Sequence, residues 1–347
     1  MTERAVARID VGAVERNCTR LPKALCAVVK ADAYGHGAGP VVEAVLAGGA
    51  TWLAVATAAE AAELRRLAVD VPVLVMGALT RDELQVAIDA EADVVAWSDE
   101  VAEAAPRVHV KLDTGMGRLG TRDRELALRL AARPNTVGVM THFATADELD
   151  DDLFPAQLQA FREFLDEVAR DDVVVHAANS AAALREPAAQ FDMVRCGVAI
   201  YGLDPFQADP GAHGLEPALS LHSWLASVRR VEPGDSVGYG CRWRAGEPTW
   251  VGTVPVGYGD GWRRALTNDC DVLIGGRRHP VVGTVSMDNV TVDLGRDPQV
   301  GVGDEVVLIG SQGDERILAE EVARRMGTIN YEVTTGLLPR VRREHFP

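Results

Sequence analysis

Between residues 24 and 199, short apolar runs alternate with stretches whose apolar positions recur at helical spacing. The runs of strand length are Leu25–Val29, Trp52–Ala56, Val73–Met76, Val94–Trp97, Val108–Leu112, Val137–Thr141, Val173–Ala177 and Met193–Ala199. The helical stretches include Ala58–Ala68, Asp82–Ala90, Arg122–Arg133 and Phe154–Arg170. Strands that alternate with helices indicate parallel βαβ units, and eight such units favour a closed (β/α)8 barrel of the TIM type. An open doubly wound sheet is the alternative, although no GxGxxG motif follows the first run.

After about Leu219 the pattern changes to strand-like runs separated by turn signals such as Pro233-Gly234-Asp235. We predict only one helix here, over Ile317–Met326, and Gly327 is placed to end it. This half is typical of a mostly antiparallel β domain. The sequence therefore predicts a barrel over residues 10–218 and a C-terminal β domain over residues 219–347, with a strand at residues 1–9 as a candidate member of the second domain.

Composition limits the partners that the chain is suited to bind. Acidic residues number 51 against 35 basic ones, a formal net charge of −16, which argues against nucleic acid or an anionic membrane as a partner. No apolar run approaches the roughly 20 residues of a membrane helix. The five cysteines include no CxxC pair, which fits a reduced cytoplasmic protein better than a disulfide or zinc scaffold. We expect no metal site, because the acidic run 147–152 is typical of a solvated loop.

Polar residues follow several of the predicted barrel strands at their carboxyl ends, the rim on which barrel active sites lie. Any one of them has a plain structural explanation, such as a surface lysine or a hydrogen-bonded histidine. Together their types suit an anionic aromatic ligand: a lysine for an aldehyde, arginines, and hydroxyl and amide groups for a phosphate. They are Lys30 after the first strand, Lys111 and Arg118 around the fifth, His142 at the sixth, Asn179 and Ser180 after the seventh, and Arg195–Val198 at the eighth.

The segment Val28–Gly37, with the sequence Val-Val-Lys-Ala-Asp-Ala-Tyr-Gly-His-Gly, resembles the pyridoxal phosphate (PLP) attachment signature of alanine racemases. Further segments resemble the same family in the same order, and the resemblance covers essentially the whole chain. They are Lys111–Arg118, Thr141–Ala144, Arg195–Gly202, Val256–Gly261, and Ser286–Asp288 with Asn330–Glu332. The resemblance implies a barrel with a C-terminal β domain, PLP as cofactor, and a head-to-tail homodimer with shared active sites. It also implies interconversion of L- and D-alanine, with D-alanine supplied for peptidoglycan.

The resemblance assigns roles residue by residue. Lys30 would form the Schiff base, and Lys30 and Tyr258 would be the two acid/bases that racemisation needs on opposite faces of a planar centre. The phosphate would be held by Tyr34, Ser180, the amides of Gly197 and Val198, and Tyr331. The other cofactor contacts would come from Arg195 at the pyridine nitrogen, Arg118 at the phenolic oxygen, His142 behind the ring, and Asn179. Arg118 and the Met287 amide would bind the substrate carboxylate, and Lys111 would carry a carbamate beside Arg118. Tyr258, Met287 and Asp288 would come from the partner subunit.

Several alternatives remain open. A serine or broad-specificity racemase on the same scaffold is the nearest, although the bulky Tyr258 and Tyr331 favour an alanine-sized pocket. A decarboxylase with the same barrel fits the Lys111–Arg118 and Val256–Gly261 motifs poorly. A non-catalytic PLP-binding protein would consist of the barrel alone, so a β domain that carries Tyr258 argues against it. The tail Pro339–Arg343 departs from the arrangement usual in the family.

Overall fold

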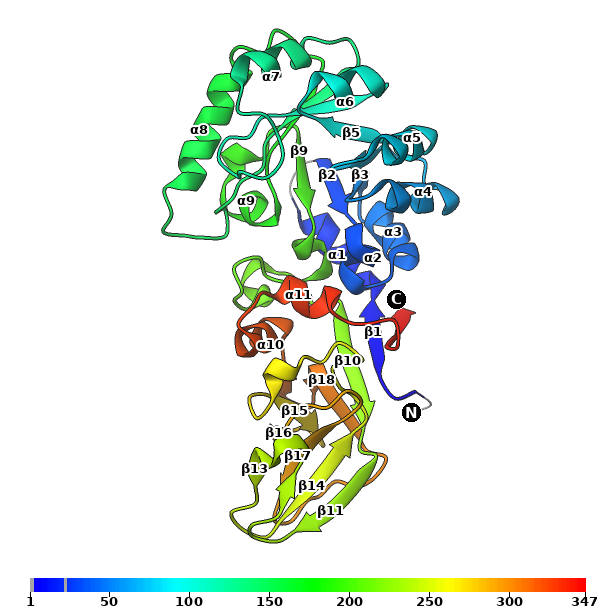
Figure 1. Ribbon diagram of the computed structural model, residues 1–347, viewed down its shortest axis with the longest axis vertical. Helices are drawn as coiled ribbons and strands as arrows, with labels where there is room; N and C mark the ends of the chain where they lie inside the picture. The colour runs from blue at the N-terminus through cyan, green and yellow to red at the C-terminus, as the bar shows by residue number, and fades with distance from the viewer. Residues whose placement is uncertain (1–2, 22–23) are drawn as a thin grey trace.

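The computed structural model describes residues 3–21 and 24–347 and has two parts, a barrel and a β domain (Figure 1). In the barrel, eight parallel strands close in chain order, which confirms the predicted (β/α)8 fold. The strands are β2 (Ala24–Val28), β3 (Ala50–Val55), β4 (Val73–Val75), β5 (Asp93–Ala96), β6 (Val108–Lys111), β7 (Thr136–Met140), β8 (Val174–His176) and β9 (Met193–Cys196). Every predicted barrel strand is therefore present.

Helix α1 precedes the first barrel strand, and the other helices of this half alternate with the strands along the chain. They are α1 (Val11–Arg20), α2 (Lys30–Gly35), α3 (Ala38–Ala47), α4 (Ala58–Arg66), α5 (Arg81–Asp89), α6 (Asp99–Ala104), α7 (Arg124–Ala131), α8 (Leu153–Leu165) and α9 (Ser180–Arg185). Capping boxes start α4, where Thr57 and Glu60 exchange hydrogen bonds, and α5, where Thr80 and Glu83 do the same. Helix α8 ends before the predicted Arg170, because residues 166–170 are mainly exposed and offer little apolar surface to bury.

The β domain is built on a sheet of ten strands in the order β11-β14-β17-β16-β15-β18-β10-β1-β20, with β19 paired to β18. The strands are β1 (Val6–Asp10), β10 (Leu219–Trp224), β11 (Ser227–Val231), β14 (Thr249–Val254), β15 (Asp271–Ile274), β16 (Arg277–Val282), β17 (Val290–Gly295), β18 (Glu305–Gln312), β19 (Glu315–Ile317) and β20 (Arg342–Phe346). A separate two-stranded sheet contains β12 (Ser236–Val237) and β13 (Trp243–Arg244). Strand β1 pairs with β10 antiparallel and with β20 parallel, so both ends of the chain lie in this sheet (Figure 1).

The prediction of a single helix in the C-terminal half was wrong, because α10 (Ala319–Met326) is followed by α11 (Asn330–Thr335). Helix α11 has only six residues, several of them β-branched with low helix propensity, so the sequence pattern does not reveal it. Buried hydrogen bonds hold these helices to the end of the barrel: Glu320 Oε1 accepts from the Asp204 amide at 2.9 Å and from Asn330 Nδ2 at 2.8 Å. Helix α11 packs against α2 and brings Tyr331 to the barrel.

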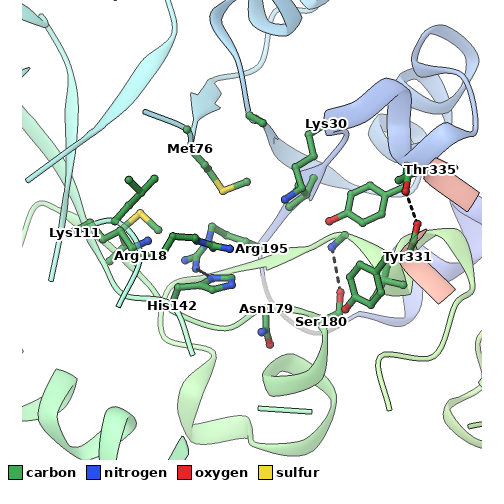
Figure 2. Close-up of a pocket in the computed structure, with 18 residues that line it drawn as sticks. Lys30, Met76, Lys111, Arg118, His142, Asn179, Ser180, Arg195, Tyr331 and Thr335 are labelled. Atoms are coloured by element: carbon green, nitrogen blue, oxygen red, sulfur yellow. Dashed lines mark hydrogen bonds between the residues drawn. The ribbon is translucent and has the colours of Figure 1, made fainter. Parts of the chain in front are cut away.

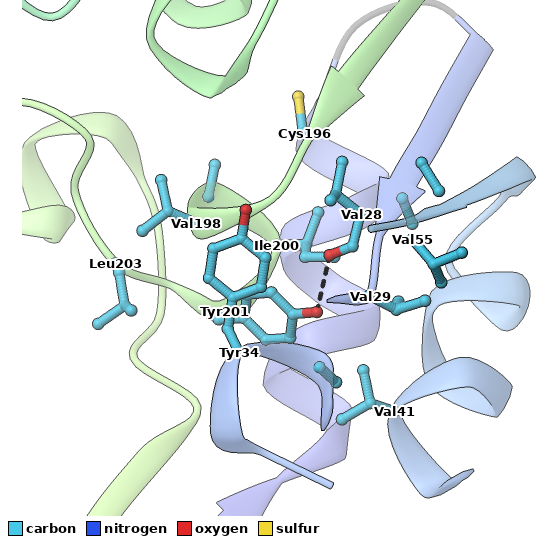
Figure 3. Close-up of a cluster of buried hydrophobic side chains, with 14 of the residues drawn as sticks. Val28, Val29, Tyr34, Val41, Val55, Cys196, Val198, Ile200, Tyr201 and Leu203 are labelled. Atoms are coloured by element: carbon cyan, nitrogen blue, oxygen red, sulfur yellow. Dashed lines mark hydrogen bonds between the residues drawn. The ribbon is translucent and has the colours of Figure 1, made fainter. Parts of the chain in front are cut away.

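An apolar cluster lies around the chain that leads into α2 (Figure 3). The fully buried Tyr201 donates a 2.9 Å hydrogen bond to the Val28 carbonyl, and its ring lies 5.0 Å from that of Tyr34. The imidazole of His36 stacks on Tyr201 at 4.5 Å. These contacts fix the backbone on both sides of Lys30. Within the described ranges, no helix is long and apolar enough to cross a membrane.

Candidate functional site

A cavity of about 500 Å³ opens at the carboxyl ends of the barrel strands. Of the predicted barrel-rim residues, the structure brings all but Cys196 to this one cavity, together with Tyr34 and with Tyr331 from α11. These residues are Lys30, Tyr34, Lys111, Arg118, His142, Asn179, Ser180, Arg195, Gly197, Val198 and Tyr331. Sequence reasoning missed other lining residues, mostly apolar side chains that carry no chemical signature. They are Val28, Ala56, Met76, Gly77, Leu119, Met140 and Thr335.

The backbone directly after Lys30 forms a left-handed turn. Residues 31–34 all have φ between +53° and +55°, a conformation that costs an L-residue about 1–2 kcal/mol each. Contacts from outside the turn hold it in place. Glu60 Oε1 accepts from the Ala31 amide at 2.6 Å, and Arg343 Nε donates to the Gly35 carbonyl at 3.0 Å. Gly35 packs so closely on α11 that an added Cβ would lie 2.2 Å from the Thr334 carbonyl oxygen.

The Lys30 amine lies in a partly desolvated position. Burial lowers the pKa of Lys30, the nearby Arg118 lowers it further, and Glu60 acts in the opposite direction. Its Nζ lies 5.9 Å from the centroid of the Tyr34 ring. A lysine whose pKa is lowered is neutral more often at physiological pH, which is the form that attacks a carbonyl carbon. Lys30 is therefore suited to covalent attachment of an aldehyde.

Neutral hydrogen-bond donors gather at one end of the cavity. Ser180 Oγ accepts from the amides of Gly197 at 3.1 Å and Ala199 at 3.3 Å, which leaves its own proton available to a ligand. Position 197 requires glycine, because a Cβ there would lie 2.2 Å from the Tyr34 hydroxyl. Burial raises the pKa of Tyr34 and of Tyr331, so both hydroxyls keep their protons and can donate. Hydroxyl donors of this kind suit a phosphate.

The other end of the cavity is cationic. Arg195 Nη2 donates to the carbonyls of Thr141 at 2.9 Å and Ala177 at 3.0 Å, and to His142 Nδ1 at 3.2 Å. Burial lowers the pKa of Arg195 to about 10, so the guanidinium stays charged at neutral pH. Burial and neighbouring cations lower the pKa of His142 well below its usual value, which keeps the imidazole neutral.

Lys111 and Arg118 belong to β6 and the loop that follows it. Lys111 is buried, and burial together with the charges of Arg195 and Arg118 lowers its pKa to about 8. The loop is held by Asp113 Oδ1, which accepts from the amides of Gly115 at 3.1 Å and Gly117 at 3.0 Å. This turn places Arg118 at the cavity, where its side chain is exposed.

Figure 2 shows Arg195 and His142 on one side of Lys30 and Ser180 and Tyr331 on the other. An elongated ligand with a phosphate at one end, an aldehyde in the middle and an acceptor atom at the other end matches this donor set, and PLP has those features. Fold and site together define a (β/α)8 barrel protein with a lysine-centred site for a phosphorylated aldehyde cofactor.

The chain belongs to the alanine racemase family. The sequence model of the alanine racemase N-terminal domain matches residues 9–205, and that of the C-terminal domain matches residues 218–345. The alanine racemase of Geobacillus kaustophilus is 42% identical over 364 residues, which cover 97% of this chain and 93% of that protein.

Solved structures agree with this assignment. The alanine racemase of Bacillus anthracis with bound L-Ala-P has a TM-score of 0.91 and 38% identity, and the match covers 100% of this chain and 96% of the other. The alanine racemase of Bartonella henselae with covalently bound pyridoxal phosphate has a TM-score of 0.89 and 27% identity, with 99% of each chain covered.

The structure places Tyr258, Met287 and Asp288 together on loops of the β domain, outside the residues that line the cavity. The Tyr258 amide donates to the Ser286 carbonyl at 3.0 Å, and Asp288 Oδ1 pairs with Arg340 Nη2 at 2.9 Å. The side chains of Tyr258 and Met287 are 37% and 51% exposed. One chain therefore assembles the barrel part of the predicted site but not these three residues.

We expect Arg343→Met to loosen the turn after Lys30. Arg343 donates to four carbonyls, those of Gly35, Leu337, Leu338 and Val341, at 2.7–3.0 Å. Loss of such charge-assisted hydrogen bonds should lower the free energy of unfolding by about 2 kcal/mol. Amide hydrogen exchange in residues 31–37 should become faster, as read by mass spectrometry. The neighbouring, exposed Arg342, which reaches Glu3 at only 3.7 Å, provides the control Arg342→Met. Equal exchange in both variants would contradict a clamping role for Arg343.

Proposed function

We propose that this protein interconverts L- and D-alanine with PLP attached to Lys30. The observation that carries the proposal is the Lys30 amine with a lowered pKa, which lies between hydroxyl donors at one end of the cavity and Arg195 at the other. The relatives described above are alanine racemases, which supports the same reaction and substrate. The covalently bound pyridoxal phosphate in one of them supports the cofactor.

When bound, PLP supplies the aldehyde for covalent chemistry and withdraws electrons from the substrate Cα. Ser180, Tyr34 and Tyr331 would bind its phosphate through their hydroxyl protons. Arg195 presents only N–H groups, so a pyridine nitrogen that faces it acts as an acceptor and stays unprotonated. Arg118, at the open side of the cavity, would bind the substrate carboxylate.

Two proton carriers complete the proposed mechanism. Lys30 Nζ moves a proton on one face of the substrate Cα, and Tyr258 Oη moves one on the opposite face. Because Tyr258 and Met287 lie exposed on the β domain of their own chain, we propose that they serve the cavity of a second chain in a twofold-symmetric homodimer. A cytoplasmic location is part of the proposal, and five free cysteine thiols are compatible with a reducing compartment.

The direct test measures D-amino-acid formation by the purified protein with PLP, using L-alanine, L-serine and L-lysine as substrates. We expect alanine to be used best and serine weakly, because the bulky Tyr258 and Tyr331 exclude longer side chains. Comparable efficiency with lysine would contradict the alanine-sized pocket. Binding of PLP without any racemisation would favour the non-catalytic carrier instead.

We also expect Lys111 to be carbamylated. Only a neutral amine reacts with CO₂, and a pKa of about 8 instead of 10.5 makes the neutral form roughly 300-fold more abundant at pH 7. The product is an anion, which we expect to pair with Arg118 and to orient it. Incubation with ¹³CO₂ should give a carbamate ¹³C resonance that is absent from Lys111→Arg. A resonance that persists in this variant, or no resonance in the wild type, would contradict the prediction.

A further inference from the structure

A column of buried polar side chains runs through the barrel interior, where such barrels normally pack branched apolar residues. Arg195 Nη1 contacts His176 Nδ1 at 2.8 Å, and His176 Nε2 contacts His109 Nδ1 at 2.7 Å. His109 Nε2 contacts Asp93 Oδ2 at 3.2 Å. Asp93 also accepts from Arg107, at Oδ1 from Nε at 2.6 Å and at Oδ2 from Nη2 at 3.2 Å. Both histidines are fully buried and Asp93 is 2% exposed, whereas the side chain of Arg107 is half exposed. The column thus links the candidate site to the opposite end of the barrel.

The barrel wall is adapted to this column. Gly138 on β7 faces His109, and a Cβ at that position would lie 2.2 Å from His109 Nδ1. Trp52 packs its ring edge-on against His109 at 5.4 Å between centroids. A glycine in mid-strand weakens the strand, so its presence here indicates that room for the imidazole matters.

The chemistry of the two ends sets the direction of every hydrogen bond in between. A guanidinium only donates, so His176 must accept at Nδ1 and carry its proton on Nε2. His176 then donates to His109 Nδ1, and His109 must carry its proton on Nε2 as well. At the far end, His109 Nε2 donates this proton in a hydrogen bond to the carboxylate of Asp93. Both imidazoles are therefore neutral and have the same tautomer. Burial lowers the pKa of each, which agrees with the neutral form.

We propose that Asp93 and His109 are positioning residues that act through His176 to fix the direction and charge of the Arg195 guanidinium. The proposal rests on the proposed function, in which Arg195 faces the pyridine nitrogen of PLP. Asp93 is the only carboxylate of the column, and Arg195 has no carboxylate among its own hydrogen-bond partners in the described residues. A reversed column would point the N–H of His176 at the N–H of Arg195, and two donors cannot bond. The direction that Asp93 imposes is therefore the one that keeps Arg195 in place.

Asp93→Asn tests the proposal because it changes one atom. Arg107 contacts both carboxylate oxygens of Asp93, Oδ1 from Nε at 2.6 Å and Oδ2 from Nη2 at 3.2 Å, and the shorter contact should keep an oxygen at the Oδ1 position. The new Nδ2 would then replace Oδ2, where it faces His109 Nε2 and can only donate. We expect both His109 and His176 to move their protons from Nε2 to Nδ1. The readout is ¹⁵N NMR of the apoprotein labelled at the histidine ring nitrogens, which requires neither PLP nor activity. In the loaded protein, kcat for alanine should fall about tenfold, the effect typical of a supporting hydrogen-bond partner, while KM changes less than about twofold.

A second substitution should rescue the first. In Asp93→Asn/Arg107→Leu the amide is free to turn its oxygen toward His109, which restores both tautomers and most of kcat. Asp99→Asn is the matched control, because Asp99 pairs with Arg129 at 3.1 Å on the surface, away from the column. We expect it to change neither the tautomers nor kcat.

The wild-type spectrum alone can overturn the proposal, whatever the variants do. A proton on Nδ1 of His176 or His109 in the apoprotein would contradict the deduced direction, even if Asp93→Asn fails to fold. Reversed tautomers in Asp93→Asn with unchanged kcat would show that the column does not act on Arg195. Absence of racemisation by the wild type, with the expected tautomers, would reject the proposed function and leave the column's direction established.

Discussion

Lys30→Ala should abolish both racemisation and covalent attachment of PLP while leaving the protein folded. Lys30 is proposed to hold the cofactor and to move a proton, and loss of a proton-transfer group alone costs about 10²–10⁴-fold in rate. We therefore expect activity to fall by at least about 10³-fold. The fold should persist, because the left-handed turn is held by contacts of Glu60, Arg343 and Gly35 rather than by the lysine side chain.

Borohydride trapping followed by peptide mapping checks this result sharply, because the chain contains only three lysines, Lys23, Lys30 and Lys111. The wild type and Lys23→Arg should both carry the reduced cofactor on the peptide that contains Lys30. Lys30→Ala should carry none. A labelled Lys111 peptide, or substantial activity in Lys30→Ala, would refute the assigned site.

The lowered pKa of Lys30 should make the free energy of unfolding of the apoprotein depend on pH. Burial lowers the pKa of Lys30 in the folded state below 10.5, so the unfolded chain binds this proton more tightly. The resulting penalty on the wild type is fully present below the folded-state pKa and disappears as the pH rises through 10.5. In chemical denaturation, the stability of Lys30→Ala relative to the wild type should therefore be highest near neutral pH and should decline toward pH 10.5. A difference independent of pH would contradict a desolvated Lys30.

The sequence predicts the barrel part of the site well because two periodic features reinforce each other. Apolar runs of strand length define the strands, and the polar residue that ends each run must lie at the same rim, since parallel strands share their carboxyl end. Residues as far apart as Lys30 and Arg195 are therefore brought together by topology alone. Tyr331 is different, because it reaches the cavity on a short helix that its own segment does not predict.

Three features could not be read from the sequence, each for a physical reason. Ala31, Asp32 and Ala33 have no intrinsic preference for positive φ, so the left-handed turn depends on tertiary contacts that local propensity does not encode. His109 and His176 look like single polar residues within apolar strands, and only the closed barrel shows that they face each other. The sequence identifies Glu60 as a capping residue of α4. It does not show that Glu60 also accepts a hydrogen bond from the turn after Lys30.

A mixed dimer should recover the activity that two inactive variants lack. Lys30 lies at the barrel rim, whereas Tyr258 lies on the β domain, outside the cavity of its own chain. If each site takes Tyr258 from the partner, a dimer of one Lys30→Ala chain and one Tyr258→Ala chain contains one site with both lesions and one with neither. Its activity should be about half that of the wild type, by the twofold symmetry of the arrangement. If both residues act within one chain, each site keeps one lesion and nothing recovers.

The measurement uses two affinity tags, one on each variant, and purification of the doubly tagged dimer after co-expression. The two homodimers, purified in the same way, should each be nearly inactive and serve as controls. The number of PLP molecules per dimer gives an independent check, since only the chain with Lys30 can attach the cofactor. A properly folded mixed dimer that carries PLP on that chain, yet is as inactive as the homodimers, would exclude the shared site. It would require Tyr258 to reach the cavity of its own chain, which its position on the β domain does not allow without rearrangement of the two domains.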